Sequence, residues 1–371
     1  MAAPTNYYVD PTSGNDTTGD GSSGTPWATM NKALTTITRD LTNGDQINLK
    51  AGTDDVLSAA MPLGTYGAPT NAAPLIIRGY TTTANDGGIG GISGGGTTGL
   101  ISTANDNHFF IDLKLHNTGS NTIAAVDRES AFINCEIANT TARGVVADNS
   151  TSVINCYFHT ISGSEAIDGG GGEAITITGC YFDVAVTTLV CRSSAVVSNN
   201  IIKLPTSSGA EGIRMIGNDS KCYNNTVFCV TGGTNAGITT GVTALVRASI
   251  YNNFVEGFSG TGGKGFEVGT GDGFFLVGSN GTRNCSTDEE FSNAEYILNN
   301  ITTNDQFGIT TSPFTDPSTG DFSVDTQLKS KGLDWFTGGG TTATTVSHTD
   351  IGAAQREEPA GGGGVAQALA Y

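Results

Sequence analysis

Charged residues stand at two fixed places in a segment that recurs through the middle of this chain. Arg143, Glu165 and Glu211 each come directly before a Gly or Ala. Asp168 follows Glu165 by three residues, and Arg214 follows Glu211 by three. On an outward-facing strand the carboxylates supply acid, base or cation-ligand groups. The two arginines supply forks that hold a carboxylate or sulfate by paired hydrogen bonds.

Two interpretations of these charges remain open from the sequence. The pair Glu165 and Asp168 precedes the pair Glu211 and Arg214 by two repeats, which predicts a separation of roughly 10 Å at ordinary strand spacing. Inverting glycosidases keep two carboxyl groups about 6.5–9.5 Å apart. An exposed sheet also needs solvated charges that pair across strands, and this explains the same pattern without any chemistry. The sequence identifies no catalytic residue.

The elements that position these charges come from a repeat about one solenoid coil long. Seven times an apolar strand runs into a turn pair such as Asn-Asn or Asn-Cys and out into a second apolar strand. The copies lie 20 to 28 residues apart, except for a last gap of 47 that we interpret as two coils. The second residue of the pair forms one column: Cys135, Cys156, Cys180, Asn200, Asn225, Asn253 and Asn300.

The residues around this column predict a bend and a ladder. Apolar residues stand three positions before it and two positions after it, as Phe132 and Ile137 do around Cys135. Both need the core, but five is an odd number, so a straight strand would place them on opposite faces. We predict that the chain bends at the pair, where Asn tolerates a left-handed backbone, and that stacked Asn side chains form a hydrogen-bonded ladder.

A second apolar element precedes each copy, for example Gly144-Val145 and Gly212-Ile213. Two or three short strands per coil predict an all-β parallel β-helix solenoid of roughly ten coils. Residues 27–41 form an amphipathic helix that we predict closes the N-terminal coil. The predicted divisions are an N-terminal segment with the capping helix, the β-helix, a C-terminal capping segment and a Gly-rich tail, at 1–50, 51–305, 306–355 and 356–371.

Composition excludes several classes of partner. The formal net charge is -18 and the pI is near 4.4, which argues against nucleic acid and against anionic membranes. No apolar run is long enough to span a membrane. An acidic polysaccharide would need a local basic groove built from only 17 Lys and Arg.

The seven cysteines and four histidines predict no metal site. Their spacing matches no zinc motif. Neighbouring members of the Cys column lie close enough in a β-helix for a disulfide, and reduced thiols that fill the turn explain the column equally. We expect no cofactor, with one weak calcium candidate in the opening loop that ordinary turns also explain. The residues of this candidate are Asp10, Asn15, Asp16 and Asp20.

The two ends of the chain bear on its location and on its assembly. The N-terminus has neither the basic segment nor the apolar core of a signal peptide, which predicts a protein made in a host cytoplasm, with secretion as the alternative. The tail 356–371 combines a Gly run with Val365, Leu369 and Tyr371, so we expect it to be flexible or to dock on a neighbouring subunit. This favours an assembly protein, and a homo-oligomer such as a trimer.

The flanks of the repeat carry a family resemblance. The opening YYVDPTSGNDTTGDGSSGTPWATMNKAL and the closing SPFTDPSTGDFSVDTQLKSKGLD, with DIGAAQ after it, resemble segments of right-handed parallel β-helix proteins of the pectate-lyase-like superfamily. The resemblance implies a right-handed solenoid, and it covers lyases, hydrolases, phage tailspikes and non-catalytic virion proteins. Pectate lyases would add a calcium site and a catalytic Arg or Lys, and no such motif is recognisable.

These observations predict a phage virion structural protein, tailspike-like or capsid-decorating. Its rigid surface would serve assembly with other virion subunits or attachment to a host glycan, and its tentative ligand residues are the five charged ones above. The alternative is a polysaccharide lyase or glycoside hydrolase acting on an acidic polysaccharide. Fold analogy alone does not decide between them.

Overall fold

The computed structural model divides the chain into two compact units, Met1–Val186 and Thr187–Tyr371. Each unit is described by itself. The structure describes residues 3–102, 106–126, 128–147, 149–170, 174–192, 194–205, 209–240, 247–268, 274–278, 280–291, 296–297, 312, 314–319 and 321–324.

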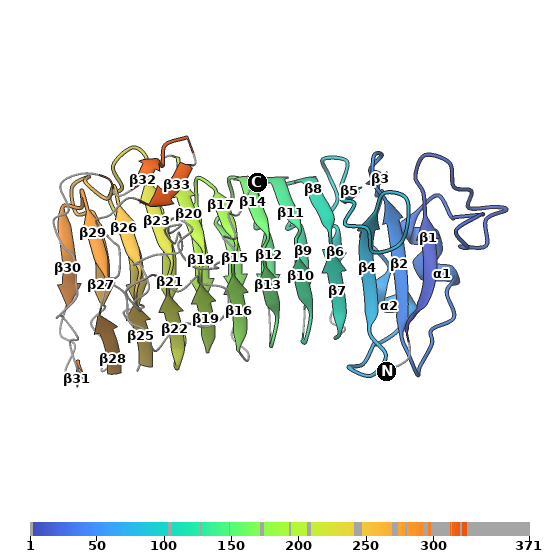
Figure 1. Ribbon diagram of the computed structural model, residues 1–371, viewed down its shortest axis with the longest axis horizontal. Helices are drawn as coiled ribbons and strands as arrows, with labels where there is room; N and C mark the ends of the chain where they lie inside the picture. The colour runs from blue at the N-terminus through green and yellow to red at the C-terminus, as the bar shows by residue number, and fades with distance from the viewer. Residues whose placement is uncertain are drawn as a thin grey trace, which may run out of the picture. The chain divides into compact units, whose positions relative to one another are not determined.

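Three parallel sheets build the first unit (Figure 1). We name them A, B and C in the order in which each coil meets them. Sheet A contains β1 (Thr5–Val9), β2 (Asp45–Lys50), β4 (Leu75–Tyr80), β7 (His108–Ile111), β10 (Ala131–Ile133), β13 (Ser152–Ile154) and β16 (Ile175–Thr178). Sheet B contains β3 (Asp55–Val56), β5 (Gly90–Ser93), β8 (Leu113–Gly119), β11 (Glu136–Thr140), β14 (Tyr157–Ile161) and β17 (Tyr181–Asp183). Sheet C contains β6 (Ile101–Ser102), β9 (Ala124–Val126), β12 (Val145–Ala147) and β15 (Glu165–Gly169).

The second unit repeats the same order of strands. Its sheet A contains β19 (Ala195–Ser198), β22 (Ser220–Tyr223), β25 (Arg247–Tyr251), β28 (Phe274–Gly278) and β31 (Tyr296–Ile297). Its sheet B contains β20 (Ile201–Leu204), β23 (Thr226–Cys229), β26 (Phe254–Glu256) and β29 (Gly281–Arg283). Its sheet C contains β18 (Thr187–Cys191), β21 (Ile213–Met215), β24 (Ala236–Thr240), β27 (Lys264–Val268) and β30 (Thr287–Phe291). The strands β32 (Phe314–Asp316) and β33 (Asp321–Val324) form an antiparallel hairpin.

The predicted core columns are confirmed. In the first unit Phe132 pairs in register with Val153, and Ile137 pairs with Phe158. All four side chains are buried. The same columns are buried in the second unit, for example at Cys222. Apolar side chains that stack in register from coil to coil therefore form the core of each unit, as expected for sheets that lose water on their inner faces.

The predicted bend is confirmed at the first residue of each turn pair. Asn134 and Asn155 have φ of 53° and 52°, and Asn199 and Asn224 have φ of 56° and 54°. Asn is the side chain that tolerates this left-handed region best after glycine. A one-residue reversal of this kind lets both flanking columns face the core.

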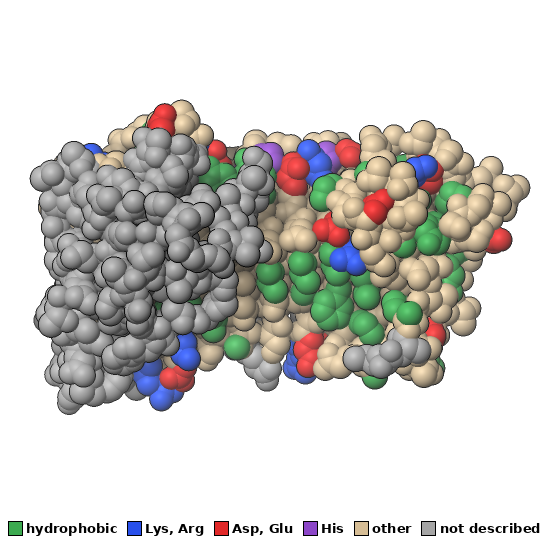
Figure 2. Space-filling model, viewed as in Figure 1, with side chains coloured by type: hydrophobic (Ala, Val, Ile, Leu, Met, Phe, Trp, Pro, Cys, Tyr) green, Lys and Arg blue, Asp and Glu red, His purple; other side chains and the backbone are tan. Residues whose placement is uncertain are grey.

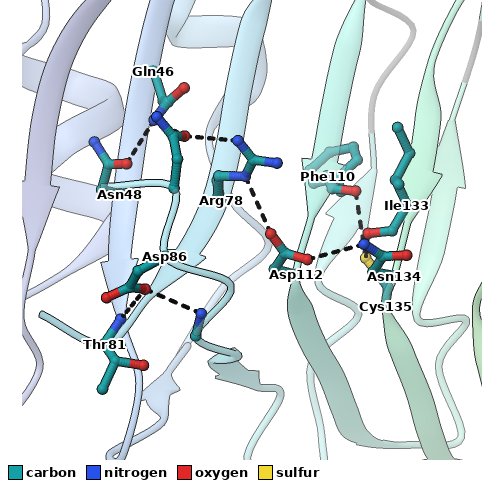
Figure 3. Close-up of polar contacts among 12 residues, drawn as sticks. Gln46, Asn48, Arg78, Thr81, Asp86, Phe110, Asp112, Ile133, Asn134 and Cys135 are labelled. Carbon is teal, nitrogen blue, oxygen red and sulfur yellow. Dashed lines mark hydrogen bonds and ion pairs between the residues drawn. The ribbon is translucent and has the colours of Figure 1, made fainter. Parts of the chain in front are cut away.

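Asp112 occupies the same bend position one coil before Asn134 (Figure 3). Asp112 has φ 54°, and its Oδ1 accepts a hydrogen bond of 3.2 Å from Asn134 Nδ2. Its Oδ2 accepts one of 3.2 Å from Arg78 Nε. The outer side chains of the corner therefore bond from coil to coil.

The second residue of each pair points inward and forms the ladder. In the second unit Asn225 Oδ1 accepts bonds from the backbone N of Asn200 at 3.1 Å and from its Nδ2 at 2.9 Å. Asn253 Oδ1 accepts the same two bonds from Asn225, each at 3.0 Å. Asn280 Oδ1 accepts them from Asn253 at 3.0 and 3.2 Å. The predicted Asn ladder is confirmed for Asn200, Asn225 and Asn253, whereas Asn300 lies outside the described residues.

Thiols replace the amides in the first unit. The backbone N of Cys135 donates to Cys156 Sγ at 3.4 Å, and that of Cys156 donates to Cys180 Sγ at 3.4 Å. All seven cysteines are free. Burial raises the pKa of Cys135 and Cys156 well above that of an ordinary thiol. The Cys column therefore consists of neutral, stacked thiols.

The predicted number of coils is too high. Four coils with all three strands lie inside each unit, for example β4–β5–β6 in the first and β19–β20–β21 in the second. The first N-terminal turn is incomplete, because β1 adds a strand to sheet A and is followed by α1 and then by β2 of the same sheet. The coil that starts at β2 has the short helix α2 (Leu63–Tyr66) where a strand of sheet C would follow.

The predicted helix over 27–41 is also too long. The observed α1 (Met30–Thr36) begins after Thr29, whose side chain accepts a bond of 3.1 Å from the backbone N of Lys32. The β-branched residues at its end disfavour further helix. Leu41, predicted on the core face, is 72% exposed. The capping role of α1 stays a prediction, as do the four predicted divisions of the chain.

Candidate functional site on the outer faces of the sheets

The predicted ligand residues lie on the strands of sheet C or just before them. Glu165, Asp168 and Arg214 belong to β15 and β21, whereas Arg143 and Glu211 come two residues before β12 and β21. Asp168 pairs in register with Val146, and both alternate with buried neighbours such as Ile167. In the second unit Arg214 stands between Val190 and Thr239. Alternation places every second residue of these strands outward. The charged column predicted from the sequence is therefore one face of a sheet in each unit.

One arginine holds two acids in the first unit. Arg143 Nε lies 2.7 Å from Glu165 Oε2 and 3.6 Å from Asp168 Oδ2. The carboxylate side chains are only 14% and 9% exposed. The hydrogen bond to Glu165 raises the pKa of Arg143, and the Asp168 charge adds to the effect. Two largely buried carboxylates thus contact one arginine.

The second unit pairs charges three residues apart in the chain, within β27 and between β21 and the residue two positions before it. Arg214 Nε contacts Glu211 Oε2, and Lys264 Nζ contacts Glu267 Oε1. The structure therefore brings Arg143, Glu165 and Asp168 together in one cluster and Glu211 with Arg214 in another. The separation of roughly 10 Å between the two clusters stays a prediction.

The opening loop uses its acidic side chains in turns. Asp10 accepts bonds from the backbone N of Thr12 at 2.9 Å and of Ser13 at 3.1 Å, and from Lys50 Nζ at 2.7 Å. Burial alone would raise the pKa of Asp10, but these bonds lower it to about 2. The four candidate residues Asp10, Asn15, Asp16 and Asp20 all accept hydrogen bonds from nearby backbone N–H groups. These contacts are those of Asx turns and of a helix start.

A second cluster, which the sequence did not single out, lies on the outer face of sheet B in the first unit. Lys114, Glu136, Tyr157 and Tyr181 form one row in register across four neighbouring strands. His116, Ala138, His159 and Asp183 form a second row beside it. We call these eight residues, together with Asp54, the sheet B patch.

Close contacts join the members of the patch. Glu136 Oε1 lies 2.8 Å from Lys114 Nζ and 3.1 Å from His159 Nε2. His116 Nε2 lies 2.8 Å from Asp54 Oδ2. The ring of Tyr157 is near-parallel to that of His159, with centroids 4.5 Å apart. Figure 2 shows acidic, basic and histidine side chains side by side along the upper edge of this view.

The Tyr157 ring also neighbours Tyr181, with centroids 5.4 Å apart and planes at 20°. Burial raises the pKa of Tyr157, and the charges of Asp183 and Glu136 raise it further. Burial alone would raise the pKa of Glu136, but the bonds to Lys114 and His159 lower it overall. The patch therefore presents neutral phenols beside an ionised carboxylate.

A sequence signal for this patch existed. Directly after the corner the chain reads KLH from Lys114, EIA from Glu136, YFH from Tyr157 and YFD from Tyr181. The middle residue of each triplet belongs to a core column, so its two neighbours must face outward. Reading those neighbours across the coils gives both rows of the patch.

The described residues hold no group of three or more His, Cys, Asp or Glu placed to bind a metal ion. None of the helices among them has the length and hydropathy needed to cross a membrane.

Comparison with known proteins supports the fold. No family model matches the chain, and no curated protein matches it. A similar solved structure is pectate lyase Pel9A, with a TM-score of 0.57, 13% sequence identity, and coverage of 96% of this chain and 98% of that chain. The chain has the parallel β-helix fold of that lyase. The predicted parallel β-helix is thereby confirmed, and at this identity the likeness concerns the fold alone.

Two further solved structures match the chain with lower scores. Geobacillus virus E2 ORF18 has a TM-score of 0.43 and 13% identity, over 73% of this chain and 61% of that chain. The GH136 lacto-N-biosidase from Eubacterium ramulus has a TM-score of 0.36 and 14% identity, over 77% of this chain and 60% of that chain.

Proposed function

We propose that this chain is a structural protein of a phage virion, tailspike-like or capsid-decorating. Its β-helix would give a rigid surface for assembly or for attachment to a host glycan. The expected partners are other virion subunits or further copies of the chain, with a trimer as the first state to test. The virion is the proposed location.

The observation that carries the proposal is the ion pairing on sheet C. Arg143 holds both Glu165 and Asp168, and Arg214 holds Glu211. Each of these carboxylates already contacts an arginine, and ion pairs of this kind suit a structural or ligand-anchoring surface.

Rigidity is the second support. Buried side chains stack in register in both units, and the inward Asn residues of the second unit bond to one another from coil to coil. Each coil is bonded to its neighbours by backbone and side chains together, as in other solenoids. A surface built this way keeps the spacing of its outer side chains, which suits repeated contacts with a polymer or a second subunit.

An enzyme remains the second candidate, and one observation favours it. Glu165 and Asp168 stand three residues apart on β15, and both reach the same arginine. A substrate that displaced Arg143 would leave two carboxylates facing each other, and their repulsion would raise the pKa of one of them. A glycoside hydrolase or polysaccharide lyase would then use this pair.

The deciding experiment measures assembly and cleavage on the same samples. The full chain and a variant without residues 359–371 are compared by light scattering and by incorporation into virus particles. Both are also incubated with a polysaccharide panel and assayed for reducing ends and unsaturated products. An oligomer that enters particles and cleaves nothing supports the proposal.

A matched pair of variants separates the two candidates. Asp168→Asn keeps the shape of the side chain and removes its charge, and Asp219→Asn makes the same change at an exposed ion pair of the second unit. Cleavage of any polymer that Asp168→Asn abolishes and Asp219→Asn leaves intact would refute the structural proposal and establish the enzyme.

A further inference from the structure

The sheet B patch has the composition of a ligand surface rather than of an ordinary solvated sheet. Seven of its eight positions on β8, β11, β14 and β17 carry side chains that hydrogen-bond or present a ring. Opposite them, on the inner face, lie buried apolar residues such as Leu115 and Phe158. Outer residues need only be polar to keep a sheet soluble. Two tyrosines and two histidines exceed that need.

The patch is held in place before any ligand arrives. Glu136 is fixed between Lys114 and His159, and Asp54 fixes His116. The Lys114 and Glu136 side chains nevertheless stay 35% and 29% exposed. Side chains that are ordered by mutual contacts lose little further entropy when they bind. The arrangement is therefore prepared for a ligand and open to it.

The geometry of the rows indicates an extended ligand. Both rows cross the strands, so successive members stand one strand apart, about 4.8 Å. Tyr157 and Tyr181 follow this spacing, with ring centroids 5.4 Å apart. A linear polymer that lies across β8 to β17 would meet a new pair of side chains at each strand. A compact ligand would meet only one or two of them.

Charge excludes an acidic polymer. The patch carries three carboxylates, Asp54, Glu136 and Asp183, against one lysine and two histidines. The whole chain has a net charge of -18. A polymer of uronic or sulfated sugars would be repelled by both. Hydroxyl and amino groups, in contrast, find acceptors in the carboxylates.

We propose that the sheet B patch binds a linear oligosaccharide of neutral or amino sugars, laid across β8, β11, β14 and β17. The stacked rings of Tyr157 and Tyr181 offer apolar edges and phenol hydroxyls to the sugar, because aromatic side chains combine a large apolar body with a polar tip. Glu136, His159 and Asp183 bond to the sugar hydroxyls around those rings. This inference deepens the proposed glycan attachment and rests on that part of the proposed function.

Direct binding tests the inference. Calorimetry on the full chain uses cellohexaose, maltoheptaose and chitohexaose as neutral probes, a chitosan hexamer as the amino-sugar probe and hexagalacturonate as the acidic probe. We expect binding of at least one neutral or amino-sugar probe and none of hexagalacturonate. Failure of all four neutral and amino-sugar probes, or a preference for hexagalacturonate, would overturn the inference.

Variants place the binding on the patch. Tyr181→Ala should weaken binding at least tenfold, and Tyr181→Phe, which keeps the ring, should weaken it less than threefold. The matched control is Tyr223→Ala, since Tyr223 and Tyr251 form another near-parallel pair, 5.2 Å apart, on sheet A of the second unit. Equal losses in Tyr181→Ala and Tyr223→Ala would refute the assignment, with circular dichroism confirming that each variant is folded.

The outcome is separable from that of the proposed function. Particle incorporation of Tyr181→Ala reports on assembly without any glycan. Normal incorporation together with lost glycan binding supports both proposals. Normal incorporation of a wild-type chain that binds no probe removes the glycan site and leaves the virion role standing.

Discussion

Replacing Asn225 by Ala tests the physical reasoning behind the whole fold. Asn225 is fully buried in the ladder of the second unit. Its Oδ1 accepts two bonds from Asn200, and its Nδ2 donates to Val197 O at 2.9 Å and to Asn253 Oδ1 at 3.0 Å. Alanine leaves these groups in place and removes their partner, so the cost is that of buried polar groups without their bonds.

The magnitude follows from the two lost acceptor contacts. A buried donor deprived of its acceptor costs about 1–3 kcal/mol. Asn200 loses the acceptor of both its backbone N and its Nδ2, so we expect Asn225→Ala to lower the local free energy of unfolding by about 2–4 kcal/mol. Because about 1.4 kcal/mol corresponds to a factor of ten, the Asn200 amide should exchange its hydrogen roughly 30 to 700 times faster.

Hydrogen exchange read residue by residue is the suitable assay, since solenoids open locally and a single unfolding midpoint averages over coils. Asn218→Ala is the matched control, because Asn218 lies exposed in a turn of the same unit. A change below about 0.5 kcal/mol in Asn225→Ala, equal to that of the control, would show that the ladder adds nothing to backbone pairing.

Three further outcomes are expected. Cys156→Ala should cost less than Asn225→Ala in matched exchange experiments, about 1–2 kcal/mol, because thiols make weaker hydrogen bonds than amides; an equal or larger cost would contradict this ranking. The pKa of Asp10 is lowered to about 2, so its contribution to stability is complete above pH ~4 and is lost as pH falls toward 2; acid titration of Asp10→Asn should lack this loss, and an unchanged profile would refute it. Gly179→Ala should destabilise the first unit by at least 1 kcal/mol, since Gly179 has φ 68° and a Cβ there would lie 2.3 Å from Asn155 Oδ1; thermal unfolding matching the parent chain would contradict it.

The sequence predicted those features that repeat in every coil. The columns of Phe132 and Ile137, the reversal at Asn134 and the ladder at Asn225 each follow from alternation and from the backbone freedom of Asn. Repetition makes such signals strong, because one irregular coil does not hide the period. Asn280 continues the ladder one coil after Asn253, which is the extra coil expected within the gap of 47 residues, whereas Asn300 lies outside the described residues.

The sequence did not predict the features that depart from the repeat. Asn280 was not recognised because Ser279 stands where the other copies carry Asn or Gly, and Thr282 replaces the apolar residue two positions after the turn. The length of α1 was overestimated because its apolar spacing continues to Leu41 after the backbone has left the helix. Periodicity reports which residues favour a face, and it carries no information on where β-branched residues end a helix.

The candidate sites were predicted only in part. The charged positions around Arg143 were recognised from the sequence, but the sharing of one arginine by two acids depends on side-chain conformations that spacing does not fix. The sheet B patch was missed for a different reason. Its members, such as Glu136 and Tyr157, are of types that any outer surface accepts, so only their register across coils makes them notable.

The Asn ladder of the second unit has a direction. Each Asn gives two bonds to the next coil and takes two from the previous one, so Asn225 and Asn253 are interchangeable modules in a one-way chain of dipoles. A module of this kind can be duplicated or removed without leaving either neighbour short of a bond. The second unit can therefore vary in length by whole coils, in increments of about 4.8 Å. The length of such a ladder is therefore fixed by its number of coils.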